Sequence, residues 1–571
     1  MREDAHDHED AHDHGEAGGG GWVRGTMTDV DAVTRVPAPV NETVLDYAPG
    51  SAERAALEVR LAELWGERAE LPHWIDGQRV GGSGRRTNVV APFEHRHVLG
   101  AFRGATGKDA RAAVDAAKAA APAWRALSYD DRAAVFLRAA ELLSGPWRQT
   151  LNAATMLGQA KTAIQAEIDA ACELIDFWRF NVHFGPEILA EQPMANAKGV
   201  WNRTDHRPLE GFVYAITPFN FTAIGGNLPT APALMGNTVV WKPSPTQALA
   251  AHYTMELLTA AGLPDGVINL VHGDGIAVSD VVLADRDLAG IHFTGSTPTF
   301  QHLWREVGSN IERYRSYPRI VGETGGKDFI LAHPSGDPEI LTTAMVRGAF
   351  EYQGQKCSAA SRAYVPRSIW KQIKEELVSV TESLTMGPTT DFSSFMSAVI
   401  DDRAFAKHKA AIDRAHATPS AKVVAGGKYD DSVGYFVRPT VVEVDDPADE
   451  VFSTEYFGPI LAVHVYNDRQ YERVVQQMEG VSGYALTGAV IATDRTAIAR
   501  ASEALRYAAG NFYVNDKPTG AVVGQQPFGG ARGSGTNDKA GAAQNLMRWT
   551  STRSIKETFV PATDHRYPHM G

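Results

Sequence analysis

Four short apolar segments, most of them followed by a turn and then a helix, repeat between residues 211 and 307 and constrain the fold more than any other feature. Strands are predicted at residues 212–216, 238–241, 266–271 and 290–294, and helices at 247–261 and 299–307. Strands that alternate with helices of this length build a parallel, doubly wound sheet. Ligands bind such sheets in the crevice at the carboxyl ends of the strands.

The remaining chain predicts more α/β structure. Helices are expected at residues 51–70, 108–145 and 148–183, and a second α/β region begins near 323, with a helix at 339–353 that leads to Cys357. Its strands are expected at 363–365, 423–424, 440–442 and 460–463. The polar, β-branched tail at 546–560 suits a strand on a sheet edge, in this chain or in a partner subunit.

Composition excludes several classes of protein. A chain of 571 residues is too long for one ordinary core, so two or three domains are expected. The net charge of −13 argues against nucleic acid and against an anionic membrane as partners. No segment is apolar for long enough to span a bilayer, and no signal peptide is visible. Two cysteines in different surroundings predict no disulfide framework and hence a reducing cytoplasmic location.

Residues 1–34 form a His-, Asp- and Gly-rich extension. This composition predicts disorder. The repeated His and Asp could bind Zn or Ni adventitiously, but nothing arranges them as ligands, and no metal site is expected.

Cys357 is the candidate nucleophile. It follows Gly354-Gln355-Lys356 and is preceded, one motif earlier, by Glu323. A thiol attacks as its thiolate, and a carboxylate can take the proton or activate a later water molecule. Taken alone, Cys357 is equally compatible with a small buried hydrophobic residue. Cys172 lies in an apolar helical stretch and is expected to be buried and inert.

Four motifs occur in a characteristic order. They are Thr217-Pro218-Phe219-Asn220-Phe221, Phe293-Thr294-Gly295-Ser296, Glu323-Thr324-Gly325-Gly326-Lys327 and Gly354-Gln355-Lys356-Cys357. With the runs at 455–459 and 527–530, this order resembles the aldehyde dehydrogenase superfamily over residues 35–560. The variants at 218–227, 322–327, 519–530 and 535–539 are similar to the branch that oxidises L-glutamate γ-semialdehyde to L-glutamate with NAD, the second step of proline degradation.

The resemblance implies an α/β fold with a Rossmann-type NAD-binding domain, an α/β catalytic domain and a small β oligomerisation flap. The implied NAD-binding domain comprises residues 35–195 and 218–322 with a return segment at 521–534, the catalytic domain 323–520, and the oligomerisation segments 196–217 and 535–571. The implied partners are a small-molecule substrate, further copies in a dimer or dimer-based homo-oligomer, and proline dehydrogenase in a transient contact.

The resemblance also implies catalytic roles. Cys357 would attack the aldehyde carbon, Asn220 and the Cys357 backbone N–H would bind the oxyanion, and Glu323 would activate water to hydrolyse the thioester that remains after hydride transfer. Otherwise, Asn220 would be a turn residue and Glu323 a solvated acid at a strand end.

Cofactor and substrate residues are implied in the same way. NAD would contact Thr217, Lys242, Gly295, Ser296, Thr297, Pro298, Thr299 and Glu455. No G-x-G-x-x-G motif is present, and Gly295 and Lys242 alone could be an ordinary helix start and a surface charge. Pro245 stands where many NAD-selective relatives have an acid, so NADP is not excluded.

At the substrate end, the backbone N–H groups of Gly520 and Ala521 with the Ser358 hydroxyl would bind the α-carboxylate, because N–H donors to an anion form charge-assisted bonds. Phe221 and Phe528 would enclose the aliphatic part, unless they only pack the core.

Three alternatives to this function stay open. The first is oxidation of another acid semialdehyde such as succinic semialdehyde. The second is a CoA-acylating enzyme, which the presence of Glu323 disfavours. The third is a catalytically silent binding or structural protein on the same fold.

Overall fold

A seven-stranded sheet forms the first half of the architecture. The computed structural model describes residues 32–571, and residues Val36–Gly571 form one unit. The strand order is β11-β10-β7-β8-β9-β2-β3. In that order the strands are Arg319–Glu323, Leu288–Thr294, Phe212–Thr217, Thr238–Pro243, Ile268–Leu270, His73–Ile75 and Gln78–Val80. The first five are parallel. The sequence predicts four of them, β10, β7, β8 and β9, but not β11, and β2 and β3 add an antiparallel edge.

Helices cover both faces of this sheet, because buried side chains alternate between its two faces. One face packs against α2 (Gly107–Ala126), α9 (Gly275–Ala284) and α10 (Thr297–Ser309). The other face packs against α3 (Tyr129–Ser144), α4 (Arg148–Gln159), α6 (Leu174–Leu189), α7 (Thr222–Leu234) and α8 (Ala248–Ala260).

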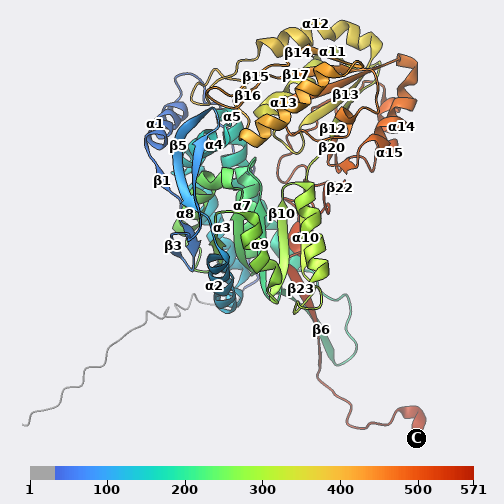
Figure 1. The fold of residues 1–571 in the computed structure, drawn as a ribbon. Helices are drawn as coiled ribbons and strands as arrows, with labels where there is room; N and C mark the ends of the chain where they lie inside the picture. The colour runs from blue at the N-terminus through green and yellow to red at the C-terminus, as the bar shows by residue number, and fades with distance from the viewer. Residues whose placement is uncertain (1–31) are drawn as a thin grey trace, which may run out of the picture. The chain divides into compact units, whose positions relative to one another are not determined.

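A second seven-stranded sheet has the order β14-β17-β18-β13-β12-β20-β21. In that order the strands are Ala421–Ala425, Thr440–Val444, Ile460–Tyr466, Ala360–Pro366, Asp328–Ala332, Thr487–Ile491 and Asn511–Val514. One face packs against α11 (Pro338–Phe350) and α12 (Arg367–Ser383), and the other against α13 (Asp402–Ala417), α14 (Tyr471–Val481) and α15 (Arg495–Ala504) (Figure 1). These elements confirm the predicted α/β architecture.

The predicted tail strand pairs within the chain. β23 (Thr550–Thr558) runs antiparallel to β6 (Val200–Pro208), and the two form a separate two-stranded ribbon (Figure 1). Arg203–Glu557 and Arg553–Asp205 ion pairs cross it. The other α-helices and strands of the described chain are α1 Ala52–Gly66, β1 Ala69–Glu70, β4 Arg86–Ala91, β5 Glu94–Arg103, α5 Ala163–Ala166, β15 Tyr429–Asp430, β16 Phe436–Val437, β19 Tyr484–Ala485, β22 Ala531–Arg532 and α16 Ala543–Met547.

Two predicted helices are interrupted. The helix expected at 108–145 is two helices, because Ser128 caps the second by accepting the Asp131 N–H at 3.1 Å. The helix expected at 148–183 breaks at Ala160, whose φ is 55°. It resumes as α5 and a π-helical segment, η1 (Glu167–Glu173), before α6.

One expected domain boundary needs correction. β7 lies between β10 and β8 in the first sheet, although residues 212–217 fall within the oligomerisation segment expected at 196–217. We therefore assign residues 212–217 to the first sheet. The extension expected at 1–34 lies outside the described residues except for its last positions.

A buried ionic network anchors the chain that precedes α1. Arg148 donates to both Glu167 and Glu42 and to the Thr43 carbonyl, and Glu167 also accepts the Leu45 N–H at 2.9 Å. Glu167 has no exposed surface, and Arg148 is 5% exposed. Buried charges of this kind remain only while each has its partner.

We predict that Arg148→Met destabilises the protein by about 3–5 kcal/mol, because Glu167 keeps a buried charge without its cation. The free energy of unfolding in urea would measure this. Arg500→Met is the control, since its ion pair with Glu472 is exposed on both sides and should be worth less than about 1 kcal/mol. Equal losses in the two variants would contradict the prediction.

Candidate active site

A cavity of about 830 Å³ is lined by residues from both sheets. Glu323 and Thr294 come from the carboxyl ends of β11 and β10, and Phe221 follows β7. Cys357 and Ser358 come from the loop that precedes β13. The carboxyl ends of parallel strands are where this fold class binds ligands.

Cys357 and Glu323 lie side by side in the cavity. The Cys357 thiol donates to Glu323 Oε1 at 3.7 Å. Burial raises the pKa of Glu323 to about 7, although the thiol hydrogen bond and the Lys539 ammonium oppose the shift. Burial and then the Glu323 charge raise the pKa of Cys357 well above its usual value. The thiol is therefore protonated at rest, beside a carboxyl group that can exchange its proton near neutral pH.

Asn220 is close to this pair but is not among the residues that line the cavity. It is buried after β7, and its Nδ2 donates to the Gln355 carbonyl at 3.0 Å. One of its two amide N–H groups is thus engaged with the loop that carries Cys357. Only the second N–H remains for a ligand.

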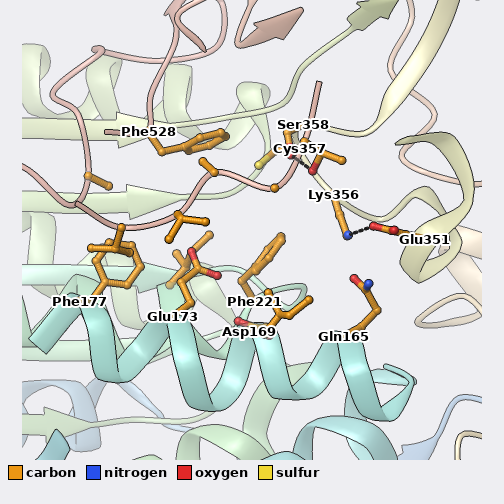
Figure 2. A pocket seen from close by; sticks show the side chains of 18 of the residues that line it. Gln165, Asp169, Glu173, Phe177, Phe221, Glu351, Lys356, Cys357, Ser358 and Phe528 are labelled. Carbon is orange, nitrogen blue, oxygen red and sulfur yellow. Dashed lines mark hydrogen bonds and ion pairs between the residues drawn. The ribbon is translucent and has the colours of Figure 1, made fainter. Parts of the chain in front are cut away.

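The expected substrate residues do meet at one cavity. Phe221, Ser358, Gly520, Ala521 and Phe528 all line it. Figure 2 labels Phe221, Ser358 and Phe528. Ser358 Oγ and Thr519 Oγ1 are 2.7 Å apart, and Gly520 has a φ of 102°, which favours glycine. Among the described residues, no acceptor is bound to the N–H groups of Gly520 and Ala521. These donors are available to an anion.

The expected cofactor residues lie at the carboxyl ends of β8 and β10 and near the second sheet. Ser296 caps α10 by accepting the Thr299 N–H at 3.3 Å, with Pro298 in the first turn. Thr297 bonds to Thr324 at 3.0 Å, and the Gly295 N–H donates to the Glu323 carbonyl at 3.2 Å. A helix start of this kind suits a pyrophosphate.

The side chains of three further cofactor candidates differ in their hydrogen-bond partners within the chain. Burial lowers the pKa of Lys242 to about 8, and its ammonium makes no hydrogen bond to a described residue. The Glu455 carboxylate accepts the Gly326 N–H at 2.8 Å. The Thr217 hydroxyl is engaged internally, since it accepts the Trp241 indole N–H at 3.0 Å. The side chains of Lys242 and Glu455 could therefore bind a dinucleotide, whereas the Thr217 hydroxyl is already used inside the protein.

A row of cavity residues escaped the sequence interpretation. Gln165, Asp169, Glu173 and Phe177 line one wall, from α5 through η1 to α6 (Figure 2). Side chains four residues apart drift around an α-helix, because one α-helical turn has fewer than four residues. A π-helical turn has more than four, so it shifts the side chains back and keeps these four on one wall. The repeated spacing of four was the available signal, but it also fits an ordinary amphipathic helix.

Glu173 differs from its neighbour Asp169. Asp169 pairs with Lys161 at 2.7 Å and accepts the N–H groups of Thr222 and Ala223. Glu173 forms no hydrogen bond or ion pair with any described residue, and burial followed by the Asp169 charge raises its pKa well above the usual value. It is a carboxyl group in the cavity with no ion-pair partner among the described residues, although the charge of Lys161 partly opposes the rise in its pKa.

Three further observations concern metal binding, membrane spans and the cysteines. Residues 32–571 contain no cluster of three or more His, Cys, Asp or Glu side chains that could hold a metal ion. None of the helices described has the length and apolar character of a membrane span. Both cysteines are free thiols, and Cys172 is buried beside Glu167 and Arg148.

Comparison with known proteins gives consistent results. A model of the aldehyde dehydrogenase family matches residues 79–555. The chain is 63% identical to the crystallised Δ-pyrroline-5-carboxylate dehydrogenase from Mycobacterium tuberculosis bound with NAD, with a TM-score of 0.92 over 95% of this chain and 100% of that one. It is 50% identical to the mitochondrial Δ1-pyrroline-5-carboxylate dehydrogenase of Bos taurus over 93% of this chain and 94% of that protein. It is 48% identical to the mitochondrial enzyme of Dictyostelium discoideum over 94% of this chain and 97% of that protein.

The cytoplasmic location expected from the sequence is contradicted by these relatives, which are named as mitochondrial. The expectation rested on unpaired cysteines and on an N-terminus without a visible signal peptide. Free thiols indicate a reducing environment, which is not unique to the cytoplasm, so they could not decide between compartments.

We predict that iodoacetamide labels Cys357 slowly at neutral pH, because alkylation requires the thiolate and burial with the Glu323 charge raises the pKa of this thiol. Glu323→Gln should speed labelling at each pH, since it removes the negative charge that disfavours the thiolate. Mass spectrometry of the labelled peptides measures both rates, and buried Cys172 is the internal control. Labelling of Cys357 as fast as that of a free thiol such as glutathione at pH 7, or slower labelling in Glu323→Gln, would contradict the geometry.

Proposed function

The chain belongs to the aldehyde dehydrogenase family, and we propose that it oxidises L-glutamate γ-semialdehyde, the open-chain form of 1-pyrroline-5-carboxylate, to L-glutamate with NAD. The observation that carries the proposal is one cavity that holds both reactive and recognition groups. Its wall contains the Cys357–Glu323 pair, with 3.7 Å between Sγ and Oε1, and the loop with the free N–H groups of Gly520 and Ala521. An aldehyde that carries a carboxylate matches both parts.

In the proposed reaction, Cys357 first transfers its proton to Glu323, and the thiolate attacks the aldehyde carbon. The oxyanion that forms is bound by the Cys357 backbone N–H, which has no acceptor among the described residues, and by the second N–H of Asn220. Bound NAD supplies the oxidant by accepting the hydride. Glu323 next releases the proton that it took from Cys357 to solvent. Its carboxylate then takes a proton from water, which attacks the thioester and releases the acid and the Cys357 thiolate.

The proposed substrate contacts divide the cavity by chemistry. The N–H groups of Gly520 and Ala521, with the Ser358 hydroxyl, bind the α-carboxylate. Phe221 and Phe528 enclose the methylene groups. Glu173 accepts a hydrogen bond from the α-ammonium group, which gives its carboxylate the ion-pair partner that it lacks among the described residues.

For the cofactor, we propose that the start of α10, from Gly295 to Thr299, binds the pyrophosphate, that Lys242 and Glu455 bind the two riboses, and that the backbone near Thr217 borders the site. NADP remains an alternative because Pro245 and the short helix at Pro245–Gln247 supply no carboxylate to repel a 2′-phosphate.

We further propose a homo-oligomer built on dimers. A two-stranded ribbon is marginally stable alone in water, and the outer edges of β6 and β23 are unpaired in this chain. A purely monomeric species in sedimentation equilibrium would contradict this. A transient contact with proline dehydrogenase stays a prediction, which cross-linking of the two purified proteins would test.

The reaction is tested with purified protein, NAD and either L-glutamate γ-semialdehyde or succinic semialdehyde, with NADH absorbance as the readout. We expect a strong preference for the first aldehyde, and no turnover by Cys357→Ala, which should still quench its tryptophan fluorescence on binding NAD. Preference for succinic semialdehyde would overturn the substrate but keep the chemistry. Normal turnover by Cys357→Ala would overturn the mechanism.

The role of Glu173 has its own test. We expect Glu173→Gln to raise KM for L-glutamate γ-semialdehyde by about tenfold or more, because a charge-assisted hydrogen bond to the ammonium is worth about 1.5–3 kcal/mol. The KM for glutaric semialdehyde, which lacks the amino group, should change little. Asp46→Asn, an exposed acid at the same cavity, is the matched control. Equal effects on the two aldehydes would contradict ammonium recognition.

A further inference from the structure

The corner at the carboxyl end of α4 contacts both loops that form the candidate active site. It consists of Gln159, Ala160 and Lys161, all of them buried. The left-handed backbone at Ala160, with φ at 55°, turns the chain so that three consecutive residues face different neighbours. Nothing in the proposed reaction uses these residues directly.

Gln159 and Asp169 hold the loop that follows β7. Gln159 Nε2 donates to the Phe219 carbonyl at 2.7 Å, and its Oε1 accepts the Thr222 hydroxyl at 3.0 Å. Asp169 accepts hydrogen bonds from the N–H groups of Thr222 and Ala223, both at 2.9 Å, and so caps the N-terminus of α7. Asn220 and Phe221 lie between these anchor points.

The same corner holds the loop that leads to Cys357. The Ala160 carbonyl accepts Gln353 Nε2 at 3.0 Å, and the Lys161 ammonium lies 4.5 Å from the centre of the Tyr352 ring. Tyr352 and Gln353 have φ values of 50° and 56°. Two successive non-glycine residues in this region need surrounding contacts that hold them there.

Lys161 is the centre of this arrangement. Its ammonium is 2.7 Å from Asp169 Oδ2, with both side chains 1% exposed, and it also lies 4.0 Å from the centre of the Phe221 ring. Figure 2 shows Phe221 next to Asp169 at the cavity wall. A cation over an aromatic face attracts the ring most strongly where water is excluded. One buried charge thus contacts a ring from each of the two loops.

We propose that Lys161, held by Asp169, is a positioning residue that fixes the Phe221 ring against the substrate and couples this wall to the Cys357 loop. The inference rests on the proposed function, because it assigns the Phe221 ring to the aliphatic part of the aldehyde. Lys161 itself does not touch the reacting atoms. Its loss should therefore weaken aldehyde binding more than cofactor binding.

The test is Lys161→Met, which keeps the length of the side chain and removes its charge, while Asp169 retains two N–H donors. We expect KM for L-glutamate γ-semialdehyde to rise by about tenfold or more, since displacement of a substrate contact by about 1 Å is costly. The Kd for NAD, measured by tryptophan fluorescence, should stay within about twofold. Lys161→Arg, which keeps a cation, should recover part of the loss in KM.

A double-mutant cycle separates positioning from a general loss of structure. If Lys161 acts through the ring, Lys161→Met should raise KM far less in a Phe221→Leu background than in the unmodified protein. Additive effects of the two substitutions, or a similar weakening of NAD and aldehyde binding, would overturn the proposal.

If Lys161→Met does not fold, Asp169→Asn tests the same idea, because it releases the ammonium without removing it. An unchanged KM in Asp169→Asn would overturn the proposal. The outcome is distinct from failure of the proposed function, in which the unmodified protein would not oxidise the semialdehyde. Turnover of the unmodified protein with an unaffected KM in the variants would reject only the positioning role.

Discussion

The parallel arrangement of β7, β8, β10 and β11 is the constraint on which the rest of the site depends. Parallel strands all end at one edge, so the residues that follow each strand are brought together without any local sequence relation. Asn220, Lys242, Ser296 and Glu323 each follow or end a different strand of this sheet. The second half of the chain contributes the loops with Cys357 and with Gly520 to the same cavity.

The cavity also sets a problem of charge. It is lined by Asp169, Glu173 and Glu323, and a buried carboxylate without a partner is costly. The structure treats the three differently. Asp169 has Lys161 and two N–H donors, Glu323 has the Cys357 thiol at 3.7 Å as its hydrogen-bond donor, and Glu173 has no hydrogen-bond or ion-pair partner among the described residues. Asp169 therefore has a structural role, whereas the carboxyl groups of Glu323 and Glu173 remain available to ligands and protons.

The sequence predicted β7, β8, β9 and β10 of the first sheet and β13, β14, β17 and β18 of the second, because apolar runs bounded by turns depend on local pattern. It did not predict β2, β3 and β11 of the first sheet, or β12, β20 and β21 of the second. It predicted less of the helical part. The break at Ala160 and the π-helical turn at Glu167–Glu173 follow from tertiary contacts, such as Gln353 to the Ala160 carbonyl, and have no local signal. The motifs led to Cys357, Glu323 and the Gly520 loop, whereas Glu173 and Lys161 were missed because spaced acids and lysines on a helix usually indicate a solvated face. The apolar run at 212–216 did predict a strand of the first sheet, although the oligomerisation segment expected at 196–217 included it.

The pKa values of Cys357 and Glu323 are both raised, and the two side chains compete for one proton. A thiolate and a carboxylate at this distance repel each other, so burial favours the state in which the thiol keeps the proton at rest. In the proposed reaction, attack on the aldehyde moves the negative charge from sulfur to oxygen, where N–H donors stabilise it, and Glu323 holds the proton that sulfur released. A carboxyl pKa of about 7 then allows Glu323 to lose this proton again before it accepts the next one from water. A carboxyl group with an ordinary, lower pKa would take the first proton poorly, and one with a much higher pKa would keep it. The burial that costs stability at Glu323 is therefore what lets a single residue serve both half-reactions.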